Sequence, residues 1–295
     1  MKKIVNIETK WLRLFEENGL KDFDSFFQKN DALEELAVEK DGAVYRFTPK
    51  GSNKRFYLKV KFSEQKRKKI RSFLKGRIYC VPVLNEVQNI KYLRKLNFRT
   101  VETAAWGISK KMGHVTASFI MTEEVIGEEF IDLYSRSKSR MRRRLYYEYG
   151  KLLGLLHRNK IDSYVRIQDL ICEVEESGHP KLTLIDREVG SLKNKNHSIS
   201  SFRNNISHVF YEGLKRYEKV PLTSREGLSF CRGYLSVRTD MKLSLKALYS
   251  ILMDEILRFI VKRKSFVRLA PLLPRKFLLW PYLKKKHQSG LPERC

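Results

Sequence analysis

The chain has 295 residues, enough for one large domain or for two lobes with separate cores. Apolar residues make up 42% of it, a share that excludes a wholly disordered chain. Lysine and arginine outnumber aspartate and glutamate by 60 to 33, and the resulting net charge of +27 predicts an anionic partner or surface. No run of about 18 apolar residues occurs and the start lacks an apolar segment, so we expect neither a spanning helix nor a secretory signal.

The first 125 residues are predicted to mix helix and strand. Apolar residues at helical spacing indicate helix within residues 10–37, and residues spaced three apart predict a second helix over 84–96 with one buried face. Four stretches alternate between apolar and polar residues and are predicted strands: 43–48, 55–62, 101–107 and 115–121. This part of the chain is therefore expected to form a small β-rich lobe.

Residues 126–261 are predicted to be mainly helical. The strongest helical pattern covers residues 140–157, and two short strand-like stretches follow, 169–174 and 181–186. The last segment, 262–295, is basic and aromatic. We therefore predict an α+β protein with a β-rich lobe over 1–125, a helical lobe over 126–261 and a basic, aromatic tail over 262–295. The four cysteines are scattered without zinc or disulfide spacing, which favours a reducing cytoplasm.

Four charged residues stand in the order in which a protein kinase presents its ATP site. Lys59 lies late in a predicted strand and Glu86 opens the next helix, where an ion pair would orient the ammonium toward a triphosphate. Asp186 ends an apolar strand, and Asp169 precedes it by one short hairpin; both offer oxygen ligands to Mg²⁺. Taken singly, each is explained as well by a solvated lysine, a surface glutamate or a turn-capping aspartate. Their order is what favours ATP and Mg²⁺.

Six segments carry a more specific resemblance, and they occur in the right order between residues 40 and 240: 56–62, 85–100, 118–125, 154–157, 184–186 and 224–234. They resemble the lipopolysaccharide core heptose kinase family, kinase-like bacterial proteins that phosphorylate inner-core sugar. The resemblance implies a bilobal protein-kinase-like fold, with ATP and Mg²⁺ as cofactors and a lipopolysaccharide core sugar, heptose or Kdo, as acceptor. It places Lys59, Glu86 and Glu123 at the nucleotide and Asp186 and Asp169 at the metal.

The sequence departs from the family after His157, where His-Arg-Asp usually supplies the proposed base. With Asp169 aligned on the metal position, Ser163 and Tyr164 stand where Arg-Asp is expected, and Asp162 lies two residues early. A second alignment makes Asp169 the base but leaves no metal ligand five residues later. Three interpretations stay open. Asp162 reaches the acceptor after a local backbone change, the loose transition state needs little base catalysis, or the chain is a pseudokinase that binds nucleotide.

Three basic clusters remain to be explained: 66–77, 136–144 and 262–286. The last one mixes cations with apolar and aromatic residues, as interfacial segments on anionic membranes do. We therefore expect a cytoplasmic protein bound peripherally to the inner membrane, where a lipid-linked sugar acceptor would be. A nucleic-acid-binding protein is the competing class, but no zinc-finger or RNA-recognition signature supports it. A kinase of the same fold acting on another small molecule or on protein is a third alternative.

Overall fold

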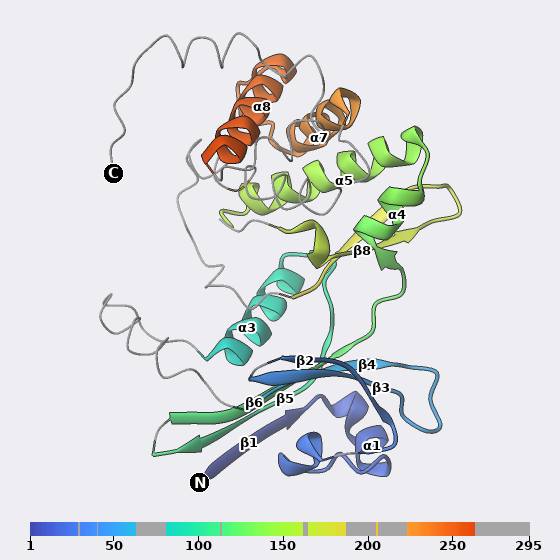
Figure 1. The fold of residues 1–295 in the computed structure, drawn as a ribbon, viewed down its shortest axis with the longest axis vertical. Coiled ribbons are helices and arrows are strands. Elements are labelled where there is room, and N and C mark those ends of the chain that lie inside the picture. The colour runs from blue at the N-terminus through green and yellow to red at the C-terminus, as the bar shows by residue number, and fades with distance from the viewer. Residues whose placement is uncertain are drawn as a thin grey trace. The chain divides into compact units, whose positions relative to one another are not determined.

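The computed structural model describes residues 1–28, 30–39, 41–62, 81–112, 114–161, 165–186, 205 and 223–262 (Figure 1). The chain divides into two compact units. The first comprises Met1–Ile126 with Thr183–Leu192, and the second comprises Gly127–Leu182 with Lys193–Cys295. The predicted domain boundaries after residues 125 and 261 stay predictions. The basic run 66–77 and the tail beyond residue 262 lie outside the described residues.

A six-stranded antiparallel sheet forms the centre of the first unit, in the order β1-β5-β6-β4-β3-β2. Its strands are β1 (Lys2–Ile7), β2 (Leu33–Glu39), β3 (Gly42–Phe47), β4 (Phe56–Lys61), β5 (Thr103–Lys111) and β6 (His114–Glu123). The four predicted strands are confirmed as β3, β4, β5 and β6. The outer strand β1 was not predicted.

The helix predicted within residues 10–37 is confirmed, but it occupies only the first part of that stretch. Helix α1 covers only Thr9–Glu17, a 3-10 turn η1 covers Asp24–Phe27, and residues 33–39 form strand β2. The helix ends because Asn18 bonds the Leu14 carbonyl through its side chain and Gly19 adopts a left-handed φ of 84°. Pairing with β3, from Leu33 opposite Phe47 onward, then decides the conformation of β2.

Helices cover both faces of this sheet (Figure 1). On one face, Phe15 of α1 packs its ring 5.8 Å from that of Phe47 and 5.1 Å from that of Phe56. On the other lies α3 (Pro82–Lys95), whose buried residues include the predicted Val87, Ile90 and Leu93. Neighbouring residues Phe119 and Ile120 of β6 belong to different apolar clusters, as the two-residue period of a strand requires.

The described residues of the second unit are mainly helical. Its helices are α4 (Phe130–Arg136), α5 (Ser139–Arg158), α7 (Ser224–Val237) and α8 (Leu245–Lys262), and a 3-10 turn η2 covers Ile167–Asp169. A small sheet orders β7 (Glu128–Glu129), β8 (Leu170–Val174) and β9 (Pro180–Leu184), whose last two residues belong to the first unit. Within the described ranges, every helix is too short or too polar to cross a bilayer.

Candidate active site

Lys59 lies on the face of β4 opposite the aromatic core. Its neighbours Leu58 and Val60 are buried, and the alternation of the strand turns Lys59 toward the α3 side, where its side chain keeps 24% exposure. Glu86 stands in the second turn of α3, a helix that Pro82 starts at its first position. The Lys59 Nζ lies 3.9 Å from the Glu86 Oε2, so the predicted strand-lysine and helix-glutamate pair is brought together.

Asp186 joins this pair from the end of β9. The Lys59 Nζ lies 3.4 Å from the Asp186 Oδ1, so the ammonium contacts both carboxylates. The approach of Asp186 is fixed by Leu184, which donates its N–H to the Arg99 carbonyl and accepts from the N–H of Val101 and the hydroxyl of Thr100. These bonds tie Leu184, two residues before Asp186, to the segment that follows α3.

The backbone of Asp186 is left-handed, with φ of 53°. Most residues other than glycine lose about 1–2 kcal/mol in this conformation, and aspartate tolerates it better than most. Such strain persists only where the surrounding structure enforces it, and it concentrates at functional sites. Here the bonds at Leu184 enforce it on one side and the contact with Lys59 accompanies it on the other. The strained residue is therefore a candidate functional group on grounds independent of its sequence context.

The three charges differ in their access to solvent. The side chain of Glu86 is only 5% exposed, whereas that of Asp186 is 39% exposed. Glu86 thus lies behind the ammonium and holds it, while Lys59 and Asp186 can meet an incoming ligand. Opposite charges about 4 Å apart attract by about 4 kcal/mol at the effective dielectric near a protein surface, enough to fix a long side chain. An oriented ammonium beside an accessible carboxylate suits a phosphate ligand accompanied by a cation.

Asp169 lies in the second unit, at the end of the turn η2. It is buried, and Arg166 binds it through two contacts, Nη2 to Oδ1 at 2.8 Å and Nε to Oδ2 at 2.9 Å. The charge of Asp169 is therefore balanced within its own turn, a partnership that sequence reasoning missed although Arg166 stands three residues away. The metal and base roles given to Asp169 stay predictions. Asp162 lies outside the described residues.

Glu123 ends β6, and its side chain pairs with the Lys54 ammonium at 2.5 Å. Its backbone N–H donates to the Glu102 carbonyl at 2.9 Å, which fixes the start of the segment leaving the sheet. The next residue, Glu124, pairs with Arg55 at 2.6 Å. Glu123 is thus held by local contacts at the position where the resemblance expects nucleotide, and its role there stays a prediction.

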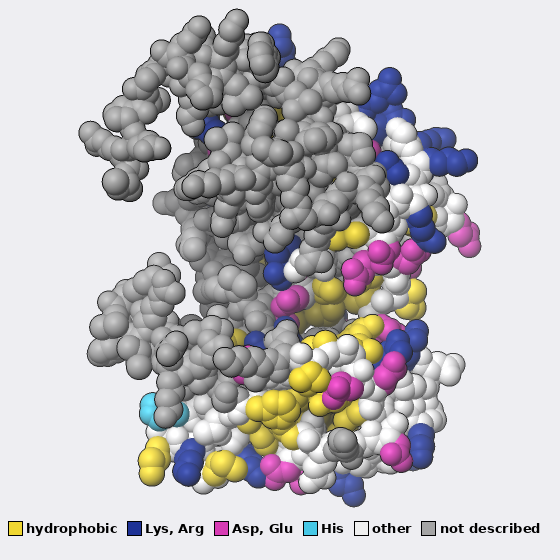
Figure 2. Space-filling model, in the orientation of Figure 1, with side chains coloured by type: hydrophobic (Ala, Val, Ile, Leu, Met, Phe, Trp, Pro, Cys, Tyr) yellow, Lys and Arg dark blue, Asp and Glu magenta, His cyan; other side chains and the backbone are white. Residues whose placement is uncertain are grey.

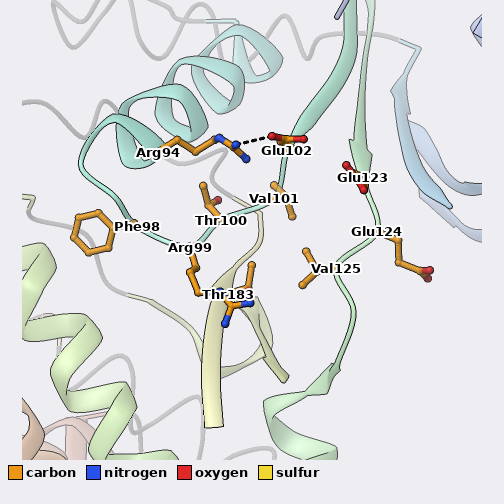
Figure 3. A pocket seen from close by; sticks show the side chains of 10 residues that line it. All are labelled: Arg94, Phe98, Arg99, Thr100, Val101, Glu102, Glu123, Glu124, Val125 and Thr183. Carbon is orange, nitrogen blue, oxygen red and sulfur yellow. Dashed lines mark hydrogen bonds and ion pairs between the residues drawn. The ribbon is translucent and has the colours of Figure 1, made fainter. Parts of the chain in front are cut away.

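A cavity of about 360 Å³ lies in the first unit beside Glu123 (Figure 3). It is lined by the end of α3, the following segment, the end of β6 and β9: Arg94, Phe98, Arg99, Thr100, Val101, Glu102, Glu123, Glu124, Val125 and Thr183. A hydrogen bond from Lys10, together with the nearby Arg94, lowers the pKa of Glu102. Sequence reasoning missed this cavity because its walls come from segments that only the fold brings together.

Within the described part of the chain, no cluster of three or more His, Cys, Asp or Glu side chains could enclose a metal ion. Asp186 supplies one accessible carboxylate.

Comparison with known proteins gives a family and a fold. Residues 27–234, more than half of the chain, match the model of the Lipopolysaccharide kinase (Kdo/WaaP) family. Among solved structures, "WaaP in complex with acyl carrier protein" is similar at a TM-score of 0.58 and 16% identity, covering 90% of this chain and 99% of that chain. At this identity the likeness concerns the fold alone, a mixed α/β arrangement of a sheet and several helices. No curated protein sequence gives a significant match.

Proposed function

The chain belongs to the lipopolysaccharide kinase (Kdo/WaaP) family, and we propose that it transfers the γ-phosphate of ATP to a hydroxyl of an inner-core sugar, a heptose or Kdo. The observation that carries the proposal is the Lys59 ammonium, 3.9 Å from Glu86 and 3.4 Å from Asp186. Kinases hold ATP phosphates with a strand lysine that a helix glutamate orients. In this proposal the two units are the β-rich and helical lobes of a kinase.

Each member of the first-unit site has one role. Lys59 binds phosphate oxygens, and Glu86, buried behind it, keeps the ammonium pointed at them. Glu123 belongs to the segment that meets the nucleotide. Because the phosphoryl transition state is loose, positioning and charge stabilisation supply most of the acceleration. A fixed ammonium with one accessible side is suited to that task.

Asp186 and Asp169 are the proposed ligands of Mg²⁺. When bound, the ion neutralises charge that develops on the transferring phosphate. A carboxylate offers about four lone-pair sites, so each Asp169 oxygen that accepts from Arg166 keeps capacity for a second partner. The Asp186 carboxylate is partly exposed. The chemistry of both groups fits the role assigned to them.

Asp162 is the proposed acceptor of the proton from the sugar hydroxyl. General-base assistance contributes roughly 10²–10⁴-fold in typical enzymes. An Asp162→Ala chain should therefore bind ATP normally and transfer phosphate at least about 100-fold more slowly. Equal transfer rates in this variant and the wild type would show that Asp162 is not the base and that positioning and charge stabilisation suffice for phosphate transfer.

We also propose that the chain works on an anionic membrane surface, where a lipid-linked acceptor would lie. Lys and Arg side chains gather on the second unit where α5 begins (Figure 2), and Lys138 and Arg140 are exposed there. Each cation near such a surface contributes about 1 kcal/mol. Removal of residues 262–295 should weaken binding to acidic liposomes, and unchanged binding would contradict a membrane role for the tail.

The test of the kinase proposal uses Lys59→Met with Lys61→Met as its matched control. Both lysines lie on β4, two residues apart and on the same face, but only Lys59 contacts Glu86 and Asp186 in the described contacts. Transfer of labelled phosphate from ATP to dephosphorylated lipopolysaccharide should fall by about 100-fold or more in Lys59→Met, as loss of an oriented phosphate contact predicts, and stay near wild type in Lys61→Met. Equal activity in the two variants would refute the assignment.

Metal dependence tests Asp186 separately. Asp186→Ala should abolish the Mg²⁺-dependent part of ATP binding. Unchanged activity in this variant would contradict the assignment of Asp186 as a metal ligand. Nucleotide binding by the wild type without transfer to any acceptor would instead identify a pseudokinase. Salt-sensitive RNA binding without nucleotide binding would favour the nucleic-acid alternative.

A further inference from the structure

The segment that joins α5 to β8 carries Asp162 and Asp169, two residues of the proposed site. Within the second unit, one buried tyrosine hydroxyl bonds a carbonyl inside this segment, and another contacts the last turn of α5, from which the segment leaves. We infer that Tyr149 and Tyr234 are positioning residues that hold this segment at two points, which we call the downstream and the upstream anchor. The inference rests on the proposed function, because only a reacting group in the segment gives its position a catalytic meaning.

The downstream anchor is a hydrogen bond from the Tyr149 hydroxyl of α5 to the Val165 carbonyl, at 2.5 Å. Both residues are 0% exposed, and the Tyr149 ring packs 5.7 Å from that of Phe130 and 5.6 Å from that of Phe230. Removing a buried donor leaves its acceptor to bear a desolvation penalty. The ring therefore sets the place of the hydroxyl, and the hydroxyl sets the place of Val165.

The upstream anchor lies in the last turn of α5. His157 is 2% exposed, and its Nδ1 lies 2.9 Å from the Tyr234 hydroxyl of α7. The same oxygen accepts from the Nη1 of Arg238 at 3.1 Å. Since arginine only donates, the Tyr234 O–H remains available to His157. The Nε2 of His157 lies 3.1 Å from Asn205, so the ring is held from both sides.

The chain leaves α5 in a fixed direction from this point. Lys160 adopts a left-handed φ of 57° and donates its N–H to the His157 carbonyl, and Ile161 donates to the Leu156 carbonyl. Ile161 is fully buried. Three residues, 162–164, separate Ile161 from Val165, so Asp162 stands between two buried points in the sequence.

Three tyrosine-to-phenylalanine variants test the inference. Tyr149→Phe and Tyr234→Phe each remove an anchoring hydroxyl and keep the ring. Tyr134→Phe is the matched control, because its equally buried hydroxyl bonds the Glu226 Oε2 of α7 at 3.1 Å and not a group of the segment. All three variants lose one buried hydroxyl, so a general loss of stability should affect them alike.

The measurements are kcat and KM for ATP, together with amide hydrogen exchange of peptides covering residues 157–169. We expect kcat to fall about ten-fold or more in both anchor variants, since a misplacement of about 1 Å can cost about 100-fold. KM for ATP should stay unchanged, and exchange at Ile161 and Val165 should accelerate. The control should keep the wild-type kcat and wild-type exchange in this segment.

Two outcomes separate this inference from the function on which it rests. An active wild type whose kcat is the same in the anchor variants and in the control would overturn the inference alone, even if exchange in the segment accelerated. A wild type that binds no nucleotide and phosphorylates no acceptor would overturn the proposed function and the positioning role with it. Equal losses of kcat in all three variants would show that the effect comes from lost stability, and would also contradict the positioning role of Tyr149 and Tyr234.

Discussion

Close packing of α5 on α7 depends on glycine, and Gly233→Ala gives the sharpest test of it. A Cβ at this position would lie 1.9 Å from the Tyr147 carbonyl oxygen and 3.1 Å from the Lys151 nitrogen, both backbone atoms of α5. An ordinary contact begins at 3.4 Å, so the oxygen and the new carbon must separate by 3.4 − 1.9 = 1.5 Å. Backbone of a helix cannot yield as a flexible side chain can, so the helices must part.

A gap of about 0.5–1 Å already forfeits a quarter to a half of a dispersion contact. Overpacked cores lose about 1–3 kcal/mol, and the size of this clash places Gly233→Ala near about 3 kcal/mol. Urea unfolding followed by far-UV circular dichroism measures the loss. Gly51→Ala is the control. Its φ of 80° strains an alanine, but nothing lies within 4 Å of the new carbon, so about 1–2 kcal/mol is expected.

The refuting result is a Gly233→Ala chain that is no less stable than Gly51→Ala. That outcome would mean that α5 and α7 are not packed at the distance described. The same substitution has a second consequence, because Tyr234 follows Gly233 directly and contacts His157 on α5. Parting the helices should therefore lower kcat as well as stability, whereas Gly51→Ala should lower stability alone.

Three further predictions concern charge and burial. The hydrogen bond from Lys10 and the charge of Arg94 lower the folded-state pKa of Glu102. Its ionised form therefore stabilises the fold above the ordinary glutamate pKa, and this contribution is lost as pH falls through the folded-state pKa. Glu102→Gln should lower Tm at neutral pH and show a smaller loss of Tm on acidification, and identical pH profiles of Tm for the variant and the wild type would contradict this. Burial raises the pKa of the Cys172 and Cys231 thiols, that of Cys231 to about 12, so both should resist iodoacetamide in the native protein and react after unfolding, with mass spectrometry as the readout. Arg166→Met removes the bidentate partner of buried Asp169 and should lower the free energy of unfolding in urea by about 3 kcal/mol. The control Arg158→Met, at an exposed residue, should lower it by almost nothing. Equal urea midpoints for the two variants would show that the Arg166–Asp169 pair contributes little to stability.

The alternation of apolar and polar residues predicted the inner strands of the sheet but not the outer strands β1 and β2. In β4, buried and partly exposed residues alternate as the sequence does, and α3 buries the stripe that its spacing indicates. The sequence of β2, Leu-Glu-Glu-Leu-Ala-Val-Glu, is rich in good helix formers, yet pairing with β3 makes it a strand with a register shift between Glu35 and Ala37. Strand β1 begins with two lysines, which weakens its alternation although it pairs with β5.

Order along the chain identified the candidate site, but its geometry required the fold. Lys59 and Asp186 are 127 residues apart in sequence, and no periodicity places their side chains 3.4 Å from each other. The partner of Asp169 needed no long-range information, since Arg166 lies within the same turn. The anchoring hydroxyls lay beyond sequence reasoning, because buried tyrosines on helices are ordinary core residues until their acceptors are known.

The left-handed backbone of Asp186 joins the fold to the proposed chemistry. A strand that simply continued past Leu184 would leave Asp186 in the extended conformation and turn its carboxylate according to the alternation of the strand. Three hydrogen bonds hold Leu184 against the segment after α3, so the change of direction is concentrated at Asp186, at a cost of up to about 1–2 kcal/mol. An Asp186→Gly chain relieves that strain and removes the carboxylate, whereas Asp186→Asn keeps the strain and removes only the charge. If the site is catalytic, both variants should lose transfer while Asp186→Gly gains stability over Asp186→Asn in thermal unfolding. A glycine variant less stable than the asparagine variant would show that the conformation is not strained and would remove one of the two independent reasons for assigning function to this residue.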